Sequence, residues 1–194
     1  MFNKKYSHKV LLGFVFLVWG GCQGHTSMPA MKMTQDSVGL AVEGINVQLA
    51  ANSGLDNSGQ WVEVPFATQV KNWFSSRFKP VGGEKVGYIV VNLAALKQTN
   101  LANGNSSKDV ISGQPSEQYE AEIDVRFEIR DSMGFAEKFA AAKIHRTATV
   151  LGDITLAQRQ ALIQKLINHA IEDADQELLQ SAKEFLPLLI QSQI

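Results

Sequence analysis

Four carboxylates in one short segment have the spacing that most resembles catalytic chemistry. Residues 119 to 130 alternate between apolar and charged side chains, and this period of two predicts a strand with one buried face. The acids on the charged face are Glu120, Glu122, Asp124 and Glu128. Two carboxylates held roughly 5 to 9.5 Å apart can hydrolyse a glycoside when they flank a sugar cleft. Arg126 and Arg130 interleave with them, so a charged face open to solvent or to a partner explains the pattern without a cleft.

The histidines are weaker candidates for a catalytic or metal site than these carboxylates. His169 and Asp173 lie four positions apart in a predicted helix and could supply two metal ligands, but a zinc site needs at least a third, which the sequence does not nominate. His145 and Arg146 are neighbours in a predicted strand, so their side chains point to opposite faces and cannot share a site. The sequence also lacks the common hydrolase, phosphate-loop and zinc-protease motifs. We therefore expect no enzyme, no catalytic residues and no metal.

The single cysteine, Cys22, has the most specific expected chemistry. The first nine residues hold three lysines and no acid, and residues 10 to 19 are an apolar run too short to span a hydrocarbon layer of roughly 30 Å. This pattern is typical of a signal peptide. Residues 18 to 22 (VWGGC) resemble the lipobox of bacterial lipoproteins. The resemblance implies cleavage after residue 21 and covalent acyl chains, including palmitate, on Cys22, with no other cofactor.

The charge composition limits the classes of partner that the chain can bind. The chain of 194 residues carries 18 basic and 19 acidic side chains, and removal of three leader lysines leaves 15 against 19, a net charge of -4. This balance provides no basic stripe for nucleic acid. We expect a signal peptide over 1–21, a lipidated flexible tether over 22–37 and a periplasmic domain over 38–194. By resemblance to the enterobacterial sorting rule, Gln23 after the cysteine favours the bacterial outer membrane.

Periodicity predicts the elements of the domain. We expect a first strand over residues 38 to 49, bent at Gly44, and a helix from 66 to 78 that must stop at Pro80. A central strand from 86 to 96 is apolar on both faces. The strand from 119 to 130 pairs in a hairpin with one from 135 to 150.

A long helix from 155 to 186 closes the predicted domain. Thr155 and Gln158 form a capping box at its start. The sum is a single small α+β domain of β-α-β-β-β-α order, with a mostly antiparallel sheet and two helices packed on one face.

Two apolar segments are candidate contacts with a partner or a lipid. Trp73, Phe74 and Phe78 form an aromatic stripe, which either packs as core or lines a groove for an acyl chain or a partner helix. The tail continues apolar beyond Pro187 and contributes Phe185, Leu188 and Leu189. It either covers a sheet edge or docks on another envelope protein.

Several segments together resemble a known family. They are residues 66 to 83, the 119 to 130 strand after a Ser-Glu-Gln lead, the Arg146-Thr147 pair, and the last helix with Asp173, Asp175, Gln176 and Glu177. They resemble a family of uncharacterised alphaproteobacterial outer-membrane lipoproteins. The order of elements is similar to auxiliary lipoproteins of the envelope, including those that accompany lipid-transport ABC systems and the lipopolysaccharide-assembly lipoprotein. The resemblance implies binding of partners or lipids and supplies no catalytic motif.

These observations predict a membrane-anchored periplasmic lipoprotein that acts as a non-enzymatic accessory subunit of a cell-envelope complex. Its partners are the membrane, through the lipid anchor, and an envelope protein. The alternative is a lipid-binding or lipid-transport module that holds an acyl chain between the sheet and the aromatic helix. A filled core with an exposed apolar strip near residues 185 to 190 favours the first hypothesis, and an apolar cavity beside the aromatic helix favours the second.

Overall fold

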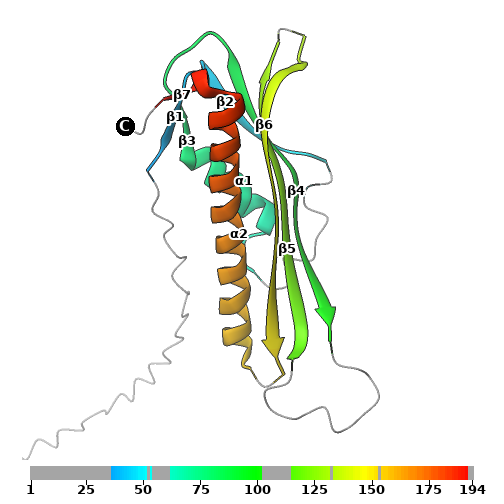
Figure 1. Cartoon of the computed structure of the whole chain (residues 1–194). Coiled ribbons are helices and arrows are strands. Elements are labelled where there is room, and N and C mark those ends of the chain that lie inside the picture. The colour runs from blue at the N-terminus through cyan, green and yellow to red at the C-terminus, as the bar shows by residue number, and fades with distance from the viewer. Residues whose placement is uncertain are drawn as a thin grey trace, which may run out of the picture.

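The computed structural model describes residues 36–51, 53, 62–101, 115–131, 133–152 and 154–191. The expected signal peptide, Cys22 and nearly all of the expected tether lie outside the described residues. The described chain folds into an α+β domain in which two helices cover one face of a mostly antiparallel sheet (Figure 1). The predicted fold class is therefore confirmed.

Four strands form the main sheet in the order β2-β4-β5-β6. Their bounds are Gly44–Leu49 for β2, Val86–Asn100 for β4, Pro115–Arg130 for β5 and Ala136–Leu151 for β6. The pair β2 and β4 is parallel, whereas β4-β5 and β5-β6 are antiparallel. The hairpin of β5 and β6 was predicted and is confirmed.

A bulge at Asn92 changes which positions of β4 face the core. Val91 pairs with Val125 but Leu93 pairs with Asp124, so β4 holds one extra residue between them. An extra residue reverses which side chains face the core. Core residues are therefore odd-numbered before the bulge, as in Ile89, and even-numbered after it, as in Leu96.

The two helices pack on the same face of the main sheet (Figure 1). Helix α1 (Phe66–Arg77) contacts β2 and β4, and helix α2 (Leu156–Phe185) contacts β5 and β6. At 1.5 Å per residue, the 30 residues of α2 extend about 45 Å. The predicted capping box is present, because Thr155 Oγ1 accepts from the Gln158 backbone N–H at 3.2 Å and Gln158 Oε1 accepts from the Thr155 N–H at 2.8 Å.

A second, smaller sheet was not predicted. It has the order β3-β1-β7, where β1 is Val38–Leu40, β3 is Phe78–Pro80 and β7 is Ile190–Gln191. The predicted strand over 38 to 49 is thus two strands in two sheets. Phe78, predicted at the end of a helix, begins β3 instead. The tail forms the 3-10 helix η2 (Pro187–Leu189) before it enters β7.

The link between β1 and β2 packs tightly against Gly83. A Cβ atom built on Gly83 would lie 2.4 Å from the backbone oxygen of Ala41, in the link between β1 and β2. Only glycine allows this approach. The link is also fixed by hydrogen bonds from Ala41 N to Leu189 O at 2.8 Å and from Glu43 N to Lys85 O at 2.8 Å.

The open edge of β6 is capped by side chains of α2. Glu177 Oε1 accepts from the Lys143 backbone N–H and Ser181 Oγ accepts from the Ala141 N–H, both at 3.2 Å. Four helical residues rise about 6 Å and two strand residues about 6.8 Å, so the two spacings match. The helix therefore satisfies backbone donors that would otherwise be available to another strand.

Candidate functional site

The outward face of the main sheet carries the charged side chains predicted for residues 119 to 130. Along β5 the buried side chains of Tyr119, Ala121 and Ile123 alternate with the half-buried side chains of Glu120 and Glu122. Both helices lie on the other face (Figure 1). The predicted alternation of a buried and a charged face is confirmed.

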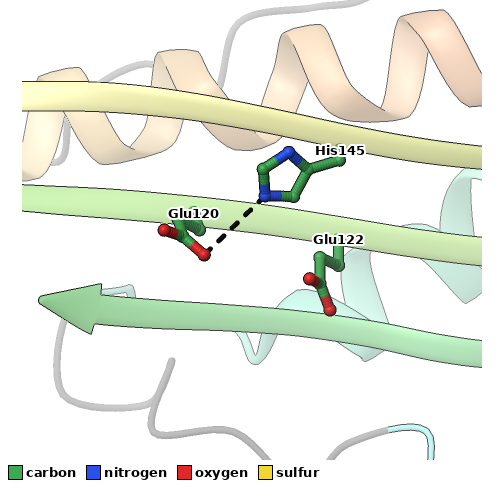
Figure 2. A group of neighbouring side chains, drawn as sticks. All are labelled: Glu120, Glu122 and His145. Atoms are coloured by element: carbon green, nitrogen blue, oxygen red, sulfur yellow. Dashed lines mark ion pairs between the residues drawn. The ribbon is translucent and has the colours of Figure 1, made fainter.

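Three potential ligand groups converge on this face. Figure 2 shows Glu120 and Glu122 rising from β5 beside His145 from β6. The register pairs Glu122 directly with His145, and Glu120 is the diagonal neighbour. His145 Nε2 lies 3.7 Å from Glu120 Oε2, and one ligand atom from each of the three residues lies within 4.8 Å of the others. The His145 side chain is 54% exposed and that of Glu120 is 27% exposed. The group is thus a shallow, solvent-facing cluster.

Two neighbouring side chains orient these carboxylates. Lys97 on β4 contacts Glu122, with Nζ 3.1 Å from Oε2. Gln118 donates through Nε2 to Glu120 Oε1 at 3.1 Å. The lysine thus places one positive charge beside the Glu122 carboxylate.

Each of the remaining acids on this face has its own hydrogen-bond partner. Asp124 accepts from Asn92 Nδ2 at 2.9 Å, and Glu128 accepts from Arg130 Nε at 2.9 Å. Arg130 also stacks over the ring of Tyr88, 4.2 Å from its centroid. This arrangement matches the charge-laced face that we considered against paired glycosidase carboxylates.

An ion pair between the helices was not predicted. Arg77 of α1 donates through Nε to Asp175 Oδ1 at 3.1 Å and Oδ2 at 3.0 Å, and the two side chains are 5% and 1% exposed. Burial raises the pKa of Asp175 above its usual value, against the opposing effect of the Arg77 charge. Within the described part of the chain, Arg77 Nη1 has no hydrogen-bond partner. The position of Arg77 was the sequence signal for its burial, because it lies at helical spacing from the buried residues Val70 and Phe74.

The structure separates His145 from Arg146, as predicted for adjacent strand residues. Arg146 faces α2 and donates through Nη2 to Asp173 Oδ1 at 2.9 Å, with a second contact through Nε. Asp173, considered as a metal ligand with His169, is thus held by a cation from β6.

The predicted contact residues differ in exposure. Phe74 and Phe78 are buried in the core and stack with ring centroids 6.0 Å apart, and Trp73 packs half-buried against that core. Phe185 is 58% exposed and Leu188 is 88% exposed. Leu189 is half-buried against the core.

Comparison with known proteins gives distant structural neighbours. No protein-family model and no curated protein matches the sequence. A minor lipoprotein from Acinetobacter baumannii is similar over 75% of this chain and 96% of its own, with 14% identity and a TM-score of 0.43. The rare lipoprotein B from Shewanella oneidensis covers 75% of this chain and 98% of its own, with 14% identity and a TM-score of 0.38.

These neighbours are lipoproteins, and the similarity is too low to place the chain in their family. In the described ranges, helices long and apolar enough to cross a membrane are not found.

Proposed function

We propose that the chain is a non-enzymatic accessory subunit of a bacterial cell-envelope complex, anchored to the periplasmic face of the outer membrane by acyl chains on Cys22. The observation that carries the proposal is a fixed apolar segment at the end of α2, where the large side chains of Phe185 and Leu188 are exposed. Exposed apolar side chains that are held in place are typical of a protein contact.

The segment is fixed by its own neighbours. Leu186, between the two exposed residues, is buried in the core. The backbone N–H of Leu189 donates to Leu186 O at 2.9 Å, and Leu189 O accepts from Ala41 N at 2.8 Å. Phe185 and Leu188 are thus presented on an ordered backbone, which reduces the entropy lost on binding.

The segment lies beside the strand that follows the expected tether. Strand β7 pairs with β1, which begins at Val38. A flexible tether of residues 22 to 37 would have a root-mean-square length of about 20 to 24 Å. Confinement to that distance from the membrane surface raises the effective concentration of the domain there, so a modest interface can hold a membrane partner.

The packing of the aromatic stripe supports this proposal over a lipid-handling module. An acyl chain between sheet and helix would have to contact Phe74 and Phe78, and both side chains are already enclosed by the protein core.

The test is crosslinking and affinity recovery of the lipidated chain from native membranes. We expect an envelope protein to be recovered with the native chain and lost with the Phe185→Ser, Leu188→Ser double variant. Leu156→Ser is the matched control, because Leu156 is 63% exposed at the other end of α2. Recovery of no envelope protein above a Cys22→Ala control would overturn the proposal. Recovery of lipid with the Cys22→Ala chain would favour the lipid-handling alternative. Metabolic labelling with a palmitate analogue tests Cys22 itself.

A further inference from the structure

We propose that Glu120, Glu122 and His145 form a binding site for a divalent ion of the zinc class on the outward face of the main sheet. The proposal goes beyond the accessory function and does not rest on it, because its grounds are the strand register and the donor atoms.

The register brings the three side chains together on one face. Glu120 and Glu122 are two positions apart on β5, so both project outward, and His145 is the cross-strand partner of Glu122 on β6. Two neighbouring strands thus supply all three groups, as Figure 2 shows. The adjacent outward positions hold Ala95, opposite Glu122, and Thr147 and Lys97, which flank Glu120 on β6 and β4.

The distances require only small side-chain rotations. In a tetrahedral site with bonds of about 2.0 to 2.2 Å, ligand atoms are separated by roughly 3.4 Å. His145 Nε2 and Glu120 Oε2 are already 3.7 Å apart, and the ligand atoms of all three residues lie within 4.8 Å. Three protein ligands leave a fourth position for water or for a donor from a partner.

The donor set selects the class of ion. One imidazole nitrogen and two carboxylates suit Zn²⁺ and other divalent transition ions. Ca²⁺ and Mg²⁺ prefer sites built only from oxygen donors. The charge balance is also favourable, because the site holds two carboxylates and, among the described residues, Lys97 is the lysine or arginine that pairs with them.

Lys97 is the competitor that the ion must displace. Its Nζ lies 3.1 Å from Glu122 Oε2, and its side chain is 57% exposed and can move away into solvent. Removal of this positive charge should therefore strengthen ion binding. A charge network without affinity for ions predicts no such gain, so Lys97 distinguishes a binding site from a solvated acidic surface.

The experiment is calorimetric titration of the full lipidated chain, in detergent and without a histidine tag, with Zn²⁺ after chelator treatment. We expect one equivalent to bind at the cluster. His145→Gln should weaken that binding by roughly tenfold or more through the loss of one of three ligands. Lys97→Met should strengthen it by about three- to tenfold through the loss of a like charge. His169→Gln on α2 is the matched control and should leave the affinity unchanged.

A second measurement reports on the ligands themselves. Co²⁺ bound in place of Zn²⁺ should show a ligand-field absorption spectrum that changes in Glu120→Gln and Glu122→Gln. Circular dichroism checks that each variant is folded. Absence of binding to the native chain, or equal affinities for the native chain and a folded His145→Gln variant, would overturn the proposal. Equal binding of Ca²⁺ and Zn²⁺ would overturn the assigned class of ion.

Discussion

Arg77 and Asp175 join the two helices through a buried, two-bond contact. Arg77 Nε lies 3.1 and 3.0 Å from the two carboxylate oxygens of Asp175, across 98 positions of sequence. Both side chains are almost fully withdrawn from water. Each charge therefore depends on the other for compensation.

Separation of this pair should cost more than removal of both partners. We expect Arg77→Met or Asp175→Leu alone to lower the free energy of unfolding by about 3 to 5 kcal/mol, because one buried charge is left uncompensated. The double variant should return to within about 1 kcal/mol of the native chain, or exceed it. Urea unfolding followed by tryptophan fluorescence measures the free energy of unfolding of the native chain, the two single variants and the double variant. A double variant as unstable as the sum of the single variants would contradict this account.

Tyr119 should ionise late. Burial and a hydrogen bond to Glu117, 3.0 Å from the phenol oxygen, raise its pKa from 10.0 to about 12. The folded state then holds the proton more tightly than the unfolded state. The stabilisation is present below pH 10 and is lost as the pH rises through 12.

The measurement is an ultraviolet titration of phenolate in the native chain. One tyrosine should titrate near pH 12, and Tyr119→Phe should remove that step. Glu117→Gln should lower the pKa of Tyr119. A late step that persists in Tyr119→Phe would assign it to another tyrosine.

The side-chain caps on β6 should limit association between chains. Glu177→Leu with Ser181→Ala exposes the backbone donors of Lys143 and Ala141 at a sheet edge. We expect concentration-dependent oligomers in sedimentation velocity, and a loss of about 1 kcal/mol of stability for each hydrogen bond. Gln176→Leu with Gln180→Ala is the control, since both residues are exposed on the same helix. Oligomers in both variants would point to added surface hydrophobicity instead.

The aromatic residues should divide into core and surface. Phe74→Ala should lower the free energy of unfolding by about 3 to 5 kcal/mol, because Phe74 is fully buried. Phe185→Ser should change it by no more than about 0.5 kcal/mol. Thermal unfolding of both variants measures this. A large loss for Phe185→Ser would mean that weaker recovery of a partner reflects unfolding rather than a lost contact.

The long elements could be predicted because each has a clear local signal. The alternation over residues 119 to 130 and the capping box at Thr155 depend on neighbouring residues alone. The small sheet could not be predicted in this way. Its strands β1, β3 and β7 have two or three residues each and come from distant parts of the chain, so no periodicity can develop.

The candidate site could likewise be predicted only in part from local sequence patterns. The alternation in the sequence predicts that Glu120 and Glu122 share one exposed face. It does not predict that His145 lies beside them, because cross-strand register is a tertiary property. A bulge such as the one at Asn92 reverses the faces of a strand without a sequence signal of its own. The Arg77–Asp175 contact depends on the docking of two helices, which local patterns do not specify.

The small sheet determines how the fold would respond to mechanical load. If the chain is held at its N-terminal side, tension reaches the domain first at β1, which is hydrogen-bonded to β3 on one side and to β7 on the other. Force would therefore pass into the C-terminal segment and the start of the α1–β4 connection before it reaches the main sheet. Under such tension the small sheet would unfold first, before the main sheet bears the load.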